Sequence, residues 1–154
     1  MKYWLMKSEP DVYSIDDLAA KSPAMWEGCR NYTVRNFFRD AMSPGDLAFF
    51  YNSNSDPIGV AGVMKIVSEA YPDPTQFDPN SHYFDPKSPL DAPRWVLRDV
   101  AFVEKYARII SLAELRTTPG LEQMQVTMRG QRLSVLPVTE DEWKIVTGLA
   151  GIRA

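Results

Sequence analysis

The apolar segments of this chain are short, and they alternate irregularly between strand-like and helix-like patterns. Helical patterns with capping residues begin near Ser14, Asn31, Ser111 and Thr139, and a weaker helical pattern runs over 121–129. Strand-like runs cover 2–7, 47–51, 58–67, 95–106 and 133–136. Because no regular succession of strand, helix and strand occurs, a doubly wound parallel sheet is not expected. The pattern predicts a mixed α/β (α+β) fold, a barrel-like sheet with short helices around it.

Length and composition restrict the function classes. A chain of 154 residues fits one domain over 1–154, and a net charge of −3 gives no general attraction to nucleic acid. One cysteine and one histidine exclude an intrachain disulfide and a Cys/His zinc cluster, so we expect no metal or cofactor. The apolar N-terminal run is too short for a signal peptide, and no run reaches membrane-span length. We expect a cytoplasmic monomer, nuclear if the source is a eukaryote, with no membrane partner.

The stretch from Trp26 to Arg39 combines an aromatic residue, a glycine turn and a helix start. Asn31 is a favourable N-cap, and the apolar positions that follow it share one face of a helix predicted to end near Met42. The opposite face carries Arg35. A helix N-terminus offers free N–H groups and partial positive charge, which suits an anion or a polar planar ligand.

Two other stretches have irregular composition. Five of the twelve prolines fall between 72 and 89, which predicts a long loop there. A loop of this length in a small domain is either functional or poorly ordered.

Gly59 and Gly62 interrupt the strand predicted over 58–67. Glycines inside a strand mark a tight corner or the close approach of a ligand or another backbone.

Six motifs occur in the order in which EVE-domain proteins have them, and they span nearly the whole chain. They are Lys7–Pro10, Trp26–Asn36, Phe50–Ser53, Gly62–Lys65, Ala70–Asp73 and Leu136–Trp143. The chain therefore resembles the EVE-domain family. Asn52 stands where the family commonly has histidine, and Cys29 where it commonly has valine. The resemblance implies a PUA-like mixed β pseudo-barrel that reads a modified base in DNA or RNA, without catalysis, through an aromatic pocket.

A single-base reader needs flat rings for stacking, polar groups for the base edge and cations for phosphate. The candidate base-binding residues are Ser8, Trp26, Asn31, Tyr32, Tyr51, Asn52, Ser53 and Trp95, and the candidate phosphate-binding residues are Lys7, Arg30 and Arg35. Each has an ordinary structural alternative. Trp26 can belong to the core, Trp95 can pack under the proline-rich loop, and Asn31 can serve only as a helix cap.

The leading prediction is a non-enzymatic reader of a modified pyrimidine in DNA or RNA. One alternative is an enzyme that acts on a nucleotide or small anion in the same pocket. Cys29 and His82 are the residues that would invite a Cys–His dyad, but nothing in the sequence places them together. A second alternative is a protein-interaction module with a structural Trp26.

Overall fold

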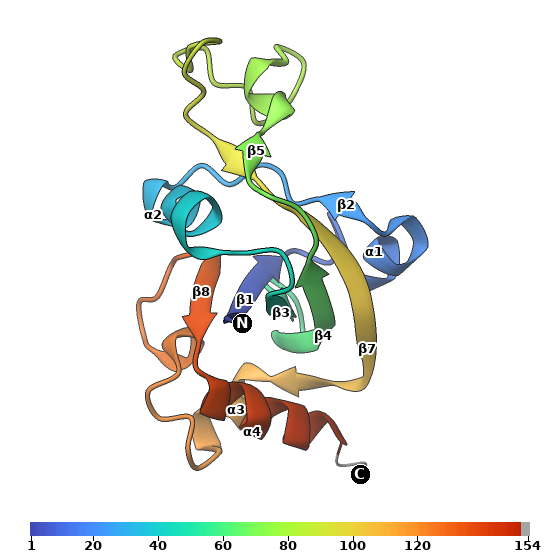
Figure 1. The fold of residues 1–154 in the computed structure, drawn as a ribbon. Helices are drawn as coiled ribbons and strands as arrows, with labels where there is room; N and C mark the ends of the chain where they lie inside the picture. The colour runs from blue at the N-terminus through green and yellow to red at the C-terminus, as the bar shows by residue number, and fades with distance from the viewer. Residues whose placement is uncertain (152–154) are drawn as a thin grey trace.

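The computed structural model describes residues 1–151 and contains a curled sheet of six strands in the order β2-β7-β4-β3-β1-β8 (Figure 1). The strands are β1 (Tyr3–Ser8), β2 (Ala24–Met25), β3 (Leu47–Asn52), β4 (Gly59–Ile66), β7 (Asp99–Ser111) and β8 (Val135–Val138). β1 pairs in parallel with β3, and the other neighbours in the sheet are antiparallel. The mixed α/β barrel-like fold predicted from the sequence is confirmed.

The helices are short and lie around the sheet. They are α1 (Ile15–Lys21), α2 (Tyr32–Asn36), α3 (Leu112–Thr117) and α4 (Glu140–Gly151), with short η1 (Phe37–Ala41), η2 (Pro74–Phe77) and η3 (Gln125–Thr127). Ser14 and Asp17 form the expected capping box of α1. Across residues 1–151, no helix has the length and apolar content to cross a membrane.

The sheet separates two hydrophobic cores, because successive side chains of a strand point to opposite faces. Trp4, Met6 and Phe50 belong to the core on the α2 side, together with Trp26. Leu5, Phe49 and Tyr51 belong to the other core, against which Trp143 of α4 packs. Trp143 is stacked on Phe49 with ring centroids 4.0 Å apart.

The glycines of β4 permit close approach of another backbone. A Cβ on Gly59 would lie 2.2 Å from the carbonyl oxygen of Ile110, and one on Gly62 would lie 2.1 Å from that of Glu104. The register of β4 against β7 shifts just after Val60. These glycines therefore form the tight, bulged corner of the sheet.

Two helical predictions differ from the structure. The helix expected over 31–42 changes at Phe37 into a wider turn, in which Met42 N donates to Phe37 O. The Nε of the buried Arg98 donates to the Phe38 carbonyl at 2.7 Å, so this carbonyl finds its partner outside the helix. The segment 121–129 forms successive tight turns, because Leu121, Met124 and Val126 all enter the second core and no single helical face carries all three.

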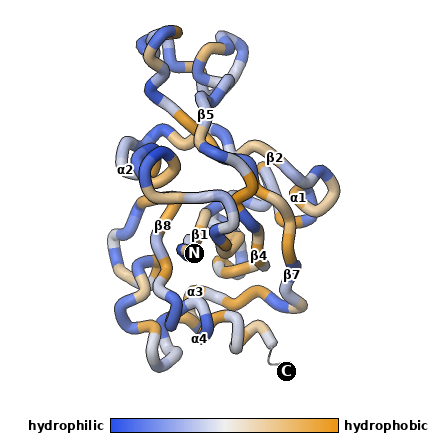
Figure 2. The backbone as a smooth tube through the Cα atoms, in the orientation of Figure 1, coloured by the Kyte–Doolittle hydropathy of each residue, from blue (hydrophilic) through white to orange (hydrophobic). Residues whose placement is uncertain are grey.

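The proline-rich segment forms an ordered lobe that projects from the sheet (Figure 1). Its base is the short pair β5 (Tyr71–Pro72) and β6 (Val96–Leu97). The fully buried Gln76 donates to the carbonyls of Asp73 and Trp95 and accepts from Ser88 Oγ and Trp95 N. Figure 2 shows that the outer part of this lobe is mainly hydrophilic, so a polar network and not an apolar core holds it.

Candidate nucleic-acid interface

A pocket of about 650 Å³ opens where the end of β1, the segment after β2 and the lobe of residues 73–95 meet. This volume lies within the roughly 300–1,000 Å³ usual for ligand pockets. Its lining residues come from four separate parts of the chain: Lys7, Ser8, Glu9, Val12, Tyr13, Met25, Trp26, Glu27, Gly28, Cys29, Arg30, His82, Tyr83 and Ser134.

Two aromatic side chains form walls of the pocket. Trp26 is 8% exposed and packs edge-on against Phe50, so it serves the core and presents only part of its ring to the pocket. Tyr83 comes from the lobe and lies over Gly28, where a Cβ would meet its ring at 2.6 Å. Gly28 also has a φ of +87°, a conformation that favours glycine.

Arg30 holds Tyr83 in place. Its Nε and Nη2 donate to the carbonyl of Tyr83, and Nη2 also donates to Thr75 Oγ1. Its Nη1 donates to the carbonyl of Cys29 and to Asp73 Oδ2, the latter at 3.1 Å. These contacts occupy the five N–H groups of the guanidinium, so the geometry does not favour the predicted phosphate contact.

Arg30 is also part of a column of stacked groups. Its guanidinium lies 5.7 Å from the ring centroid of Tyr83 and 5.6 Å from that of Trp95. Trp95 stacks on Tyr32 at 4.9 Å, and the Arg35 guanidinium covers Tyr32 at 4.7 Å. The column therefore runs from α2 to the pocket wall. Tyr32, Trp95 and Arg35 support that wall from behind and are not among the residues that line the pocket.

The remaining predicted residues lie in several places. Asn31 caps α2 by accepting from Thr33 N and Val34 N, and Tyr51 is buried in the second core. Asn52 lies opposite Ser8 in the β1–β3 pair, and Ser53 N donates to the Ser8 carbonyl. Of the eleven predicted site residues, the pocket brings together Lys7, Ser8, Trp26 and Arg30.

Polar atoms in and near the pocket lack protein partners. Tyr13 Oη and Asn52 Oδ1 are buried and have no hydrogen-bond partner within residues 1–151. Tyr13 lines the pocket, whereas the Ser8 hydroxyl is already engaged, because it donates to the Tyr13 carbonyl at 2.6 Å. The unpaired Tyr13 Oη therefore carries the cost of a buried polar group without a partner.

Burial disfavours charge on several groups of the pocket. It lowers the pKa of Lys7, and it raises the pKa of Glu27, to which the negative charge of Asp73 adds. Burial also raises the pKa of the Cys29 thiol to about 11, so this thiol is protonated near neutral pH. Although Cys29 and His82 both line the pocket, a protonated thiol is a poor nucleophile. Within residues 1–151, no group of three or more His, Cys, Asp or Glu side chains could hold a metal ion.

Sequence reasoning missed Tyr13, Glu27 and Tyr83 as pocket residues, and it considered His82 only as a partner of Cys29. His82 and Tyr83 fall in the proline-rich segment, where no periodicity indicates which side chains face the body of the domain. The density of prolines and aromatic residues in a long loop was the available signal.

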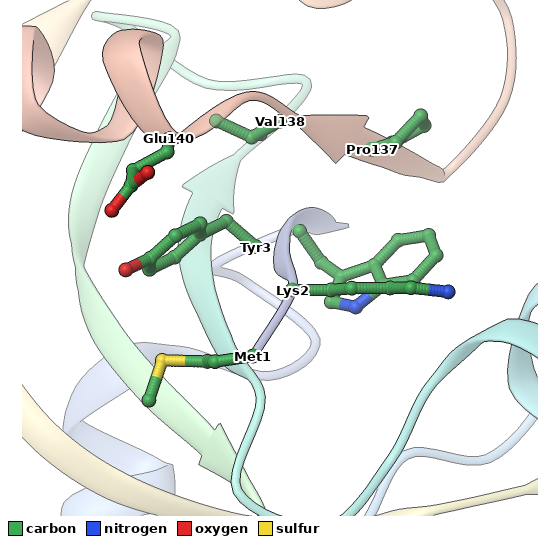
Figure 3. Close-up of a pocket in the computed structure, with 7 residues that line it drawn as sticks. Met1, Lys2, Tyr3, Pro137, Val138 and Glu140 are labelled. Atoms are coloured by element: carbon green, nitrogen blue, oxygen red, sulfur yellow. The ribbon is translucent and has the colours of Figure 1, made fainter.

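A second hollow of about 600 Å³ lies along the edge shared by β1 and β8 (Figure 3). Its lining includes Lys2, Tyr3, Trp4 and Glu140. Lys2 Nζ donates to the Ala41 carbonyl, and Trp4 Nε1 donates to Asp46 Oδ2 at 3.1 Å. Because these polar groups are already paired, this groove offers less for base recognition than the pocket beside Trp26.

The fold and the first pocket define a small mixed α/β pseudo-barrel domain with an aromatic-walled pocket at one end of its sheet. The chain belongs to the EVE domain family, which its sequence matches over residues 2–149. It is 46% identical to human thymocyte nuclear protein 1, in a match that covers 96% of this chain and 73% of that protein.

Solved structures agree with this assignment. A Pseudomonas syringae protein superposes with a TM-score of 0.92 at 46% identity and covers 96% of this chain and 99% of its own. Human THYN1 protein, in complex with DNA that contains 5-methylcytosine, superposes with a TM-score of 0.92 at 44% identity over 100% of both chains. The resemblance predicted from the sequence motifs is confirmed.

Proposed function

We propose that this protein binds DNA that carries 5-methylcytosine or a closely related modified base. The observation that carries the proposal is the superposition on human THYN1 protein, whose structure contains 5-methylcytosine DNA, at a TM-score of 0.92 over the full chain. The modified base leaves the duplex and enters the pocket between Trp26 and Tyr83.

The proposed role is binding without catalysis. The Cys29 thiol, with a pKa near 11, is not an activated nucleophile, and Arg30 is fully engaged in holding the pocket wall. The aromatic wall of the pocket instead suits reversible capture of a planar ligand.

A binding panel tests the proposal. Duplexes that differ only at one base, with 5-methylcytosine, cytosine or thymine, are compared by fluorescence anisotropy, with a matching methylated RNA as a further arm. Burial of one methyl group contributes about 0.8 kcal/mol, which predicts a preference for methylated DNA of about fourfold or more. Equal affinity for the methylated and unmethylated duplexes would refute the proposal. Tighter binding of the methylated RNA than of the methylated DNA would indicate an RNA ligand.

Tyr83→Ala is the informative variant, because Tyr83 is half-buried in the lobe, whereas Trp26 also belongs to the core. We expect this variant to keep its fold and lose the preference for the methylated duplex. The neighbouring Phe84 is 39% exposed and does not line the pocket, so Phe84→Ala is the matched control and should retain the preference. The proposed role of Tyr83 fails if both variants discriminate as the wild type does.

A further inference from the structure

We propose that residues 128–134, here called the basic loop, bind the phosphate backbone of DNA beside the pocket through Arg129 and Arg132. The inference rests on the proposed function, because it assigns the backbone contacts of the same complex. Both arginines predicted to bind phosphate are already engaged. Arg30 holds the lobe, and Arg35 donates to Asn36 Oδ1 and to the Arg94 carbonyl.

Arg129 and Arg132 have exposed side chains and, among residues 1–151, make no side-chain hydrogen bond or ion pair. Each of the other arginines in this range has a partner. Arg94 forms an ion pair with Asp85 Oδ2 at 4.0 Å. The remaining six donate to a carbonyl, an amide oxygen or a carboxylate: Arg30, Arg35, Arg39, Arg98, Arg108 and Arg116. A free guanidinium retains the fork of N–H donors that can hold two phosphate oxygens.

The position of the basic loop connects it to the pocket. The loop ends at Ser134, which lines the pocket and whose carbonyl accepts from Lys7 N at 2.8 Å. Gly130 separates the two arginines in a turn with a φ of +78°, and nothing lies within 4 Å of the place where its Cβ would be. The turn therefore projects into open space beside the pocket and not into the body of the domain.

Charge differs between the two sides of the pocket. The segment 123–139, which includes the basic loop, contains no Asp or Glu. The lobe on the other side carries four acidic residues, Asp73, Asp78, Asp85 and Asp91, against the two cations Lys87 and Arg94, so it is net negative. A polyanion is attracted to the first side and repelled from the second, which is how a protein with a net charge of −3 can bind DNA at one face.

Salt dependence tests the inference, because each lost phosphate contact reduces the slope of log K against log salt by about 0.9. The variant is Arg129→Gln/Arg132→Gln, measured against methylated and unmethylated duplexes between 50 and 300 mM NaCl. We expect the slope to fall by about 2 and the affinity for both duplexes to fall by the same factor, about tenfold at 100 mM.

The charge-matched control is Lys65→Gln/Lys144→Gln. Both lysines are exposed. Lys65 lies opposite Leu47 at the start of β3, whereas Ser8 lies opposite Asn52 at its other end. Lys144 is in α4. This control should keep the wild-type slope. A slope for the arginine variant equal to that of the control would overturn the inference.

A third variant, Arg129→Lys/Arg132→Lys, separates charge from folding because it retains both cations. It should recover most of the slope. If it binds as weakly as the glutamine variant, with the same reduced slope, the loss does not come from phosphate charge and the inference is wrong. A reduced slope in a protein that does not discriminate methylated DNA would support the basic loop and refute the proposed reader function, so the two failures are distinguishable.

Discussion

Arg30 shows how the role of a residue depends on its partners and not on its type. An arginine beside a glycine turn in a nucleic-acid-binding chain is a reasonable phosphate ligand on sequence alone. In the structure its donors are directed to Tyr83, Cys29, Asp73 and Thr75. Lys7, by contrast, lines the pocket and makes no side-chain hydrogen bond or ion pair with residues 1–151, so its contact with phosphate stays a prediction.

Gly28→Ala should disrupt the pocket through one methyl group. The new Cβ would lie 2.6 Å from the Tyr83 ring, and the φ of +87° is unfavourable for alanine, so the ring must move. We expect affinity for methylated DNA to fall about tenfold, which is about 1.4 kcal/mol. Gly148→Ala in α4, where nothing lies within 4 Å, is the control and should bind normally. Unchanged binding by Gly28→Ala would show that Tyr83 does not shape the site.

Cys29 provides a chemical test of the enzyme alternative. With a pKa near 11, less than about one thousandth of the thiol is ionised at pH 7.5. Iodoacetamide should therefore modify Cys29 far more slowly than it modifies free cysteine at this pH, with a rate that keeps rising through pH 9. Rapid alkylation that levels off near pH 7 would indicate an activated thiolate and would revive the enzyme hypothesis.

At the scale of elements, the proline-rich segment is an ordered lobe that builds part of the site. The hydrogen bonds of the buried Gln76 fix the conformation of the lobe. A column of stacked groups joins the lobe to α2: Arg35, Tyr32, Trp95 and Arg30. Trp95 Nε1 also donates to Asp85 Oδ2 at 2.7 Å within the lobe. Because the lobe contributes Tyr83 and His82, its attachment controls the shape of the pocket.

Arg30→Lys tests this attachment while keeping the charge. A lysine has no planar fork and cannot reproduce the contacts to Tyr83, Thr75 and Asp73 together. We expect faster amide hydrogen exchange in residues 73–95 and weaker discrimination of methylated DNA, with exchange in β3 and β4 unchanged. Wild-type exchange in the lobe of this variant would contradict the assigned role of Arg30.

Asp73 makes the stability of the contact between the lobe and Arg30 depend on pH. Burial acts to raise its pKa, but hydrogen bonds from Gly28 N and Thr75 and the charge of Arg30 outweigh burial, and the pKa lies below its usual value. A lowered pKa in the folded state stabilises the protein above the unfolded pKa of about 3.9, and this stabilisation is lost as pH falls through the folded value.

Asp73→Asn should therefore lower the free energy of unfolding by on the order of 2 kcal/mol at pH 7, because it removes a buried, hydrogen-bonded charge. Urea unfolding of both proteins from pH 7 to pH 2.5 measures this. The difference should stay constant above pH 5 and shrink as the pH falls below about 4. A difference that is independent of pH down to 2.5 would mean that the Asp73 charge does not stabilise the fold.

At the scale of the whole molecule, local sequence patterns predicted most of the elements. The apolar run 47–51 became β3, the Ser14 capping box began α1, and the glycines of β4 allowed the bulged corner. The segment 121–129 was mispredicted as a helix, because its buried side chains reach the second core only when the backbone forms turns. Tertiary packing, not local propensity, decided its conformation.

The site was less predictable than the fold, because it is assembled from residues distant in sequence. Trp26 and Lys7 lie in recognisable sequence motifs. Tyr83 lies in no such motif and reaches the pocket because the lobe folds against the body of the domain. Tyr51 and Trp95 were both predicted to bind the base, but neither lines the pocket. Tyr51 is buried in the second core, and Trp95 belongs to the column that supports the pocket wall. Which face of the sheet a residue occupies, and which loop lies against it, follow from long-range contacts.

The central claim is that a modified base enters the pocket between Trp26 and Tyr83. The most direct measurement uses a duplex whose single 5-methylcytosine carries a ¹³C-labelled methyl group, with intermolecular nuclear Overhauser effects recorded in the complex. We predict contacts from that methyl group to ring protons of Trp26 or Tyr83, and their loss in Tyr83→Ala. Contacts from the methyl group only to residues outside the pocket, such as Tyr32 in α2, would contradict the account.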